Sequence, residues 1–497
     1  MKYFHRLVLV CFVAPALGQG SQQDSSHPQP KEFVTHHQGT FGGRPIRFKA
    51  VAGEIYLTNK DGQAAASVWS TSYMLDGEAS ADRPVTFAFN GGPGSASVWL
   101  HLGLLGPRLV KVSNDGHDDG ASPYTLINNT NGFLDLTDLV LVDPVGTGYS
   151  TVIGDTSPKD YWGLQEDARS IAMFVRHWLK KYKRWNSPKY LLGESFGTTR
   201  AVAVTKALDG AGQSVAINGL ILISQGLDYT SAVPDHDNIV SFVNYLPSLA
   251  ACAWYHRKAG VGESLEKFTR EASDFALNEY VNLLFRGERI SQQESDRAVD
   301  RLVYFTGLSK VYVEKAGLKI SPYRYTKELL RDSQLTIGLL DGRFTVNEDD
   351  QLSDEPSLGD AYFSSVNSAY FTALNHYYTT ELNVLMDRPY LTSNPEVAAN
   401  WNWMSPPGNA YWDAKYVNVS RDLGNAMRTN KDLRVFVANG YYDLVTPFAD
   451  AEYTFARHGI LRDRISMTYY EAGHMMYVHE PSLIQLCKDI RAFYSKP

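Results

Sequence analysis

Three side chains spread along the chain have the types needed together for nucleophilic catalysis. Ser195 lies in Gly193-Glu194-Ser195-Phe196-Gly197, which matches the pattern G-x-S-x-G. A serine hydroxyl is a poor nucleophile at neutral pH, so it needs a histidine to accept its proton and a carboxylate to orient that histidine. His474 and Asp443 are the candidates for these two roles. The predicted chemistry is attack by Ser195 on a carbonyl carbon.

The segments on either side of Ser195 predict the setting that this motif requires. Tyr190-Leu191-Leu192, directly before the motif, is an apolar run typical of a buried strand, and residues 198–208, directly after it, predict a helix. In this setting the motif forms a sharp strand-to-helix turn that presents the serine at the edge of a sheet. Glycines permit the close backbone approach and the strained dihedral angles of such a turn.

The histidine is selected by its position after a predicted strand. Residues 465–470 predict a strand, and His474 lies in the loop just beyond it. His479 is the obvious rival, but it precedes Glu480-Pro481, where a surface loop or the start of a helix is expected. We therefore predict that His474 is the general base.

The aspartate is selected in the same way. Asp443 follows the predicted strand 433–437 after a short turn, as expected of the acid that orients a catalytic histidine. Asp432, Asp450 and Asp463 lie at strand starts or within helices, where solvated or capping carboxylates are usual. The chain order serine, aspartate, histidine is the order found in α/β-hydrolases.

Backbone donors for a tetrahedral intermediate are predicted in two places. Asn90-Gly91-Gly92-Pro93-Gly94 directly follows the apolar strand 85–89 and can supply N–H groups close to a reacting carbonyl. Taken alone, this segment could also be an ordinary glycine-proline turn. The second donor is predicted to be the N–H of Phe196, immediately after the nucleophile.

The arrangement of predicted elements indicates an α/β-hydrolase fold, with a mostly parallel central sheet flanked by helices. Residues 160–182 carry one apolar stripe at helical spacing between two predicted strands, which is the strand-helix-strand pattern of a parallel sheet. Residues 33–227 and 428–497 are predicted to form the two parts of this core. Residues 228–427 lack strand periodicity and predict a large, mainly helical insertion. It is either a cap over the active site or a second packed domain.

Composition restricts the classes of partner. The 497 residues carry a formal net charge of −7 with a pI of about 6.0, which argues against nucleic acid or an anionic membrane. Neither a His-Glu-x-x-His motif nor a dinucleotide-binding glycine pattern after a strand occurs in the sequence, so no metal and no cofactor are predicted. The oligomeric state is expected to be monomer or homodimer.

The N-terminus resembles a secretory signal peptide. Basic residues precede the apolar stretch 7–17, which is too short to span a bilayer, and Ala16-Leu17-Gly18 offers a cleavage site. We predict a signal peptide over 1–18, a polar tether over 19–32, no membrane anchor, and export to the periplasm or the extracellular space. The alternative is a disordered N-terminus of a cytosolic protein. After cleavage Cys252 and Cys487 would remain, and in an oxidising compartment they could pair.

Four blocks in the same chain order resemble the serine carboxypeptidase family. The four blocks are 90–95 (Asn-Gly-Gly-Pro-Gly-Ser), 143–150 (Asp-Pro-Val-Gly-Thr-Gly-Tyr-Ser), 193–197 and Gly473-His474-Met475. The resemblance covers about residues 40–225 and 430–495. It implies a secreted enzyme that removes residues one at a time from the C-termini of peptides and proteins.

The resemblance also implies roles for individual residues. Asn90 and Glu194 would hydrogen-bond the terminal carboxylate of the substrate, with help from the backbone of Gly91. Gly92 would belong to the oxyanion hole, and Met475 would lie against the side chain of the leaving residue. Two carboxyl groups can sit together if they share a proton, which favours binding at acidic pH.

One departure from the family bears on this carboxylate site. The family has a Glu before Leu-Gly-Pro in the carboxylate-binding network, whereas this chain has Leu104. The loss of that acid is expected to weaken or reshape recognition of a free C-terminus and to raise the pH optimum. The alternative function is an esterase or an acyltransferase that uses the same three catalytic residues. A secreted binding protein with an idle site is a further alternative.

Overall fold

The computed structural model of the chain describes residues 29–77, 81–114, 116, 120–210, 212–403 and 416–495. Within these ranges, ten strands form one mixed sheet. The strand order is β1 (Glu32–Phe41), β2 (Arg44–Thr58), β3 (Ala64–Leu75), β7 (Asp138–Val142), β4 (Val85–Phe89), β9 (Lys189–Glu194), β10 (Gly219–Ile223), β13 (Arg434–Gly440) and β14 (Ile465–Tyr470), with β8 (Thr151–Val152) paired to β3. The predicted signal peptide and most of the predicted tether lie outside the described residues.

The sheet has an antiparallel part and a parallel part. Strands β1, β2, β3 and β7 pair antiparallel, and β7, β4, β9, β10, β13 and β14 pair parallel. The central strands β4, β7, β9 and β10 are buried along their whole length, as expected of parallel strands covered on both faces. The predicted strand 465–470 coincides with β14. Residues 46–57 belong to one continuous strand, β2, because its pairing with β3 runs unbroken from Phe48 to Leu57.

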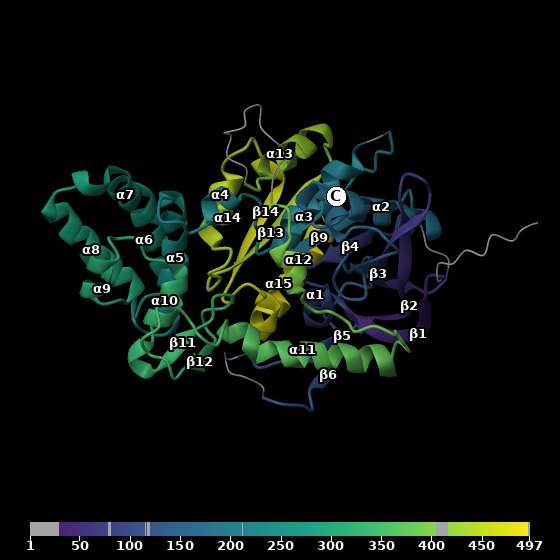
Figure 1. The fold of residues 1–497 in the computed structure, drawn as a ribbon, viewed down its shortest axis with the longest axis horizontal. Helices are drawn as coiled ribbons and strands as arrows, with labels where there is room; N and C mark the ends of the chain where they lie inside the picture. The colour runs from purple at the N-terminus through teal and green to yellow at the C-terminus, as the bar shows by residue number, and fades with distance from the viewer. Residues whose placement is uncertain are drawn as a thin grey trace, which may run out of the picture.

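Helices cover both faces of the sheet (Figure 1). Apolar side chains of one face pack in a single core with α2 (Leu164–Lys181), α3 (Phe196–Leu208) and α13 (Ser420–Thr429). The other face packs with α1 (Val98–Leu100), α11 (Ala361–Thr380) and α15 (Glu480–Ser495). The predicted helix 160–182 is shorter at its start, because residues 158–160 form a separate turn of 3-10 helix.

A long segment separates two neighbouring strands of the sheet. β10 pairs in parallel with β13, from Gly219 opposite Arg434 onward, although residues 224–433 lie between them in the chain. Part of this segment forms a helical group with its own apolar core beside the sheet (Figure 1). Its helices are α5 (Ile239–Tyr255), α6 (Leu265–Phe275), α7 (Val281–Arg286), α8 (Gln292–Thr306), α9 (Lys310–Lys315) and α10 (Pro322–Glu328). The remaining short elements are α4 (Tyr229–Ala232), α12 (Pro395–Ala399), α14 (Phe448–Phe455), and the strand pairs β5 (Arg108–Lys111) with β6 (Thr125–Asn128) and β11 (Leu335–Ile337) with β12 (Thr345–Asn347).

Cys252 and Cys487 are both buried and both free, so the structure contains no bond between them. Among the described residues, no helix has the length and apolar character needed to cross a membrane.

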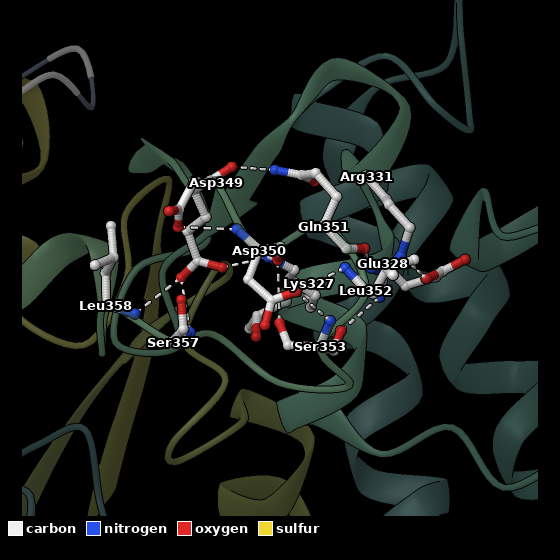
Figure 2. A network of polar contacts seen from close by, with 12 residues as sticks. Lys327, Glu328, Arg331, Asp349, Asp350, Gln351, Leu352, Ser353, Ser357 and Leu358 are labelled. Atoms are coloured by element: carbon white, nitrogen blue, oxygen red, sulfur yellow. Dashed lines mark hydrogen bonds and ion pairs between the residues drawn. The ribbon is translucent and has the colours of Figure 1, made fainter.

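A buried ion pair fastens an acidic loop to α10. Lys327 and Glu348 form this pair with at most 1% of either side chain exposed. Glu348 also accepts the N–H groups of Ser357 and Leu358, at 2.9 and 3.1 Å, and Lys327 donates to the carbonyl of Asp350 at 2.7 Å. Figure 2 shows these contacts converging on the loop from α10. The pair closes the loop that leads into α11.

We expect Lys327→Met to lower the free energy of unfolding by about 3–5 kcal/mol, because Glu348 would be left buried and unpaired. Lys327→Met combined with Glu348→Gln should recover part of this loss, since no unpaired charge remains. Urea denaturation followed by circular dichroism measures both. Lys310→Met, at the exposed pair with Asp300, is the matched control and should change stability far less. An equal effect of the two single variants would contradict the prediction.

Candidate active site

Ser195 occupies a strained turn between β9 and α3. Its φ and ψ are 59° and −130°, a sparsely populated region for a residue with a side chain, which costs about 1–3 kcal/mol. A Cβ on Gly193 would lie 2.0 Å from the carbonyl oxygen of Gly197. A Cβ on Gly197 would lie 2.6 Å from the carbonyl oxygen of Phe89. Both glycines of the motif are therefore required by the close approach of backbone to backbone.

His474 and Asp443 are brought together by the loops after β14 and β13. His474 Nδ1 lies 2.7 Å from Asp443 Oδ2, and both side chains are buried. Asp443 Oδ1 accepts the backbone N–H groups of Val445 and Thr446, at 2.8 and 2.9 Å. The Thr446 hydroxyl donates to Asp443 Oδ2 at 2.7 Å. These contacts orient the carboxylate toward Nδ1, which leaves Nε2 of the ring to accept a proton.

Backbone contacts connect the serine turn to the histidine loop. The Ser195 N–H donates to the carbonyl of Ile223 at 3.0 Å, and the Ser224 hydroxyl donates to the carbonyl of His474 at 2.6 Å. A Cβ on Gly440 would lie 2.1 Å from the carbonyl oxygen of Gly473. The carboxyl ends of β9, β10 and β13 thus meet where Ser195, Asp443 and His474 are found.

The long segment between β10 and β13 also contacts the histidine loop. The N–H of His474 donates to the carbonyl of Leu340 at 2.7 Å, and the N–H of Gly473 donates to Asp341 Oδ2 at 3.0 Å. Arg343 holds Asp341 through a buried ion pair at 2.6 Å. The side chain of Asp360 accepts the N–H of Leu340 at 3.1 Å. These residues were not predicted from the sequence, where Asp341 lies far from every motif.

His474 has a raised pKa in spite of its burial. Burial lowers the pKa of the imidazole, but the charge of Asp443 and its hydrogen bond outweigh this effect, with smaller contributions from Glu194 and Asp360. The rival His479 has a pKa lowered to about 4 by burial, and its Nδ1 lies 2.8 Å from the hydroxyl of Ser482 in the first turn of α15. His479 therefore marks the start of a helix, one of the two settings expected for it.

Asp450 is one of the three aspartates that rival Asp443 as candidates for the acid that orients His474. Asp450 differs from expectation, because it is buried within α14 rather than solvated or capping. It accepts a hydrogen bond from the side chain of Gln225 at 3.0 Å and another from Ser231. Burial raises its pKa to about 7. Its partners are structural side chains, and none of them is a predicted site residue.

The glycine loop after β4 lies directly against the serine turn. A Cβ on Gly91 would lie 2.5 Å from the backbone nitrogen of Phe196. Gly92 has a φ of +100°, and a Cβ there would lie 2.7 Å from the nitrogen of Gly94. The buried guanidinium of Arg200 donates to the carbonyl of Asn90 and supports the loop from the α3 side. The two predicted sources of backbone donors, the loop and Phe196, are thus adjacent.

Asn90 and Glu194 form a hydrogen-bonded pair beside this loop. Asn90 Nδ2 donates to Glu194 Oε1 at 2.8 Å, and Asn90 Oδ1 accepts the N–H of Leu100 at 3.0 Å. Burial raises the pKa of Glu194 to about 7, against opposing effects of His474, Tyr477 and Asn90. A carboxyl group with this pKa is largely protonated in mildly acidic solution and can then donate a hydrogen bond to another carboxylate.

Two further predicted features have packing contacts. Met475 is buried, and the hydroxyl of Tyr362 in α11 donates to its sulfur at 3.1 Å. In the block 143–150, Asp143 Oδ1 accepts the N–H of Ser97 at 2.8 Å, so this block supports the start of α1. Leu104 is fully buried in the π-helical turn η1 (His101–Leu105).

The parallel sheet, the strained serine turn and the hydrogen-bonded Asp443–His474 pair define an α/β-hydrolase. The sequence profile of the serine carboxypeptidase family matches residues 45–469, so the chain belongs to that family. It is a serine carboxypeptidase, an enzyme whose substrates are peptides. A comparison with curated protein sequences finds no match.

Two solved structures are similar to this chain. Kex1ΔP, a prohormone-processing carboxypeptidase from Saccharomyces cerevisiae, is 16% identical with a TM-score of 0.56, over 90% of this chain and 91% of that one. A proline iminopeptidase from Mycobacterium smegmatis is 13% identical with a TM-score of 0.36, over 89% and 97% of the two chains. At such identities the similarity of the first structure supports the fold alone.

Proposed function

We propose that Ser195, His474 and Asp443 hydrolyse the C-terminal peptide bond of peptides and proteins through an acyl-enzyme. Ser195 Oγ attacks the carbonyl carbon while His474 Nε2 takes its proton, and the N–H groups of Gly92 and Phe196 bind the oxyanion. His474 then gives the proton to the leaving amine as the C–N bond breaks. Water, activated by the same imidazole, releases the acyl group and restores the serine.

The observation that carries this proposal is the buried Asn90–Glu194 pair beside the serine turn. Glu194 in its protonated form would donate to the terminal carboxylate of the substrate, together with Asn90 and the N–H of Gly91. An esterase or acyltransferase that acts on neutral substrates has no need of a buried acid in this position. Met475 would then lie against the side chain of the leaving residue.

The raised pKa values of Glu194 and His474 predict opposite effects of pH on catalysis. Glu194 must be protonated to donate, so the KM for substrates with a free carboxylate should rise as pH increases through about 7. His474 must be neutral to accept a proton, so kcat should fall as pH decreases through its raised pKa. The profile of kcat/KM against pH should therefore be bell-shaped.

The decisive comparison is between a blocked dipeptide with a free C-terminal carboxylate and its C-terminal amide, from pH 4 to 8. We expect the acid to be cleaved at least about tenfold better below pH 7, the scale of one or two charge-assisted hydrogen bonds. Glu194→Gln keeps a donor at this position without its charge, so it should flatten the dependence of KM on pH. Equal cleavage of acid and amide in the wild type would favour the esterase alternative.

Two further parts of the proposal concern the surroundings of the enzyme. We propose that the insertion over 228–427 serves as a cap, because the N–H of Asn394 donates to the carbonyl of Gly94 at 2.8 Å and Leu340 contacts His474. We also propose export to the periplasm or the extracellular space, which detection of the mature chain beginning near residue 19 would test. The oligomeric state, monomer or homodimer, stays a prediction.

A further inference from the structure

Two buried polar atoms of the candidate site have no partner in good hydrogen-bond geometry. Glu194 and Tyr477 are each about 3% exposed, and within the described part of the chain neither Glu194 Oε2 nor the Tyr477 hydroxyl makes a well-formed hydrogen bond, although the two groups interact with each other. Buried polar atoms without partners are rare and destabilising, so each one calls for an explanation. The Tyr477 hydroxyl lies beside the Glu194 carboxyl, and the hydrogen-bonding interaction between them lowers the pKa of Glu194, against the larger effect of burial. A ligand carboxylate that accepts a hydrogen bond from each group would satisfy both.

The Tyr477 ring is fixed by the backbone around it. It belongs to the short 3-10 helix η7 (Met476–Val478), which follows His474 and leads into α15. A Cβ on Gly103 would lie 2.4 Å from the Tyr477 ring and 2.7 Å from the hydroxyl of Tyr370. The ring therefore packs against the backbone of η1, and the hydroxyl is positioned by the same loop that holds His474. The next residue of η1 is Leu104, so this turn offers the site no acid.

The protonation of Glu194 and Tyr477 determines which hydrogen-bond donors the site offers at each pH. Burial, followed by the charge of Glu194, raises the pKa of the Tyr477 hydroxyl well above its ordinary value, so it stays protonated throughout the working range. The titratable groups that affect Glu194 or are affected by it are His474, Asp443, Tyr477, Tyr370 and Tyr362. As pH rises through about 7, Glu194 loses its proton and Tyr477 remains as a donor.

We propose that Tyr477 is a substrate-binding residue whose hydroxyl donates to the C-terminal carboxylate of the peptide, alongside Glu194. The inference rests on the proposed carboxypeptidase function and adds a recognition group to it. The tyrosine supplies a neutral donor where the sequence has Leu104 in place of an acid. A tyrosine donor does not titrate with Glu194, so recognition of the free C-terminus should persist above the pKa of that acid.

The test is Tyr477→Phe, assayed with the acid and amide forms of one blocked dipeptide. We expect KM for the acid to rise about tenfold, the scale of one lost hydrogen bond, with kcat changed less than about twofold. The KM for the amide should stay the same. The pH at which KM for the acid begins to rise should also increase, because the hydroxyl that lowered the pKa of Glu194 is gone.

A matched control separates binding from packing. Tyr494→Phe removes another hydroxyl, one that hydrogen-bonds Thr86 Oγ1 at 2.6 Å near the start of β4, and it should leave KM for both substrates unchanged. Thermal unfolding of both variants shows whether each is folded. An unchanged KM for the acid in Tyr477→Phe, or an equal change for acid and amide, overturns the inference while the wild-type preference for the acid stands. A wild type without that preference overturns the proposed function, and the inference with it.

Discussion

Ser195→Ala is expected to lower kcat by about 10⁵–10⁶-fold, because no other group can form the acyl-enzyme. The residual rate should come from the oxyanion donors and from substrate positioning, which the substitution leaves in place. Alanine meets the same backbone restriction as serine at a φ of 59°, so the turn should be retained. Binding of a peptide with a free C-terminus, measured by calorimetry, should change less than about threefold, since the proposed carboxylate site is intact.

Ser214→Ala is the matched control for this variant. Its hydroxyl donates to the carbonyl of Asp209 at 3.1 Å on an exposed turn after α3, and its loss should leave kcat unchanged. Active-site titration with a serine-reactive phosphonate should label the wild type and Ser214→Ala and should not label Ser195→Ala. Activity of purified Ser195→Ala within about tenfold of the wild type would contradict nucleophilic catalysis by this residue.

The serine turn could be predicted from sequence because its causes are local. Gly193 and Gly197 lie two residues from Ser195, and the structure gives each a backbone contact that excludes a side chain. An apolar run before the turn and a helical pattern after it complete the signal within a short segment. The same reasoning applies to β14, whose predicted and observed bounds coincide.

The groups that hold the histidine loop could not be predicted, because they depend on contacts between distant segments. Asp341 accepts the N–H of Gly473, which lies 132 residues further along the chain. Tyr477 is close to His474 in sequence, but only the fold shows that its ring packs against Gly103 and that its hydroxyl lies beside Glu194. Thr446 is the exception, since a hydroxyl three residues after an aspartate in a turn commonly bonds that carboxylate.

Asp443→Asn is expected to lower kcat by about 10⁴-fold through the wrong tautomer of His474. Asp443 Oδ1 accepts two backbone N–H groups, from Val445 and Thr446, so the amide oxygen of asparagine should take that position. The amide NH₂ would then face His474 Nδ1, which lies 2.7 Å from Oδ2 in the wild type. Nδ1 would have to accept, and the ring proton would move to Nε2, where it blocks the transfer from Ser195.

The pH profile and a neighbouring variant test this explanation. Loss of the Asp443 charge removes the main effect that offsets burial, so the pKa of His474 should fall and the acidic limb of the kcat profile should move to lower pH. Thr446→Val removes a donor to Asp443 Oδ2 but keeps the carboxylate, and it should lower kcat by about tenfold or less. If Asp443→Asn retained activity within about tenfold of the wild type, another group would have to orient His474. The two backbone N–H groups that donate to Asp443 Oδ1 are what make an isosteric, uncharged replacement so harmful at this position, because they direct the amide NH₂ of asparagine toward His474.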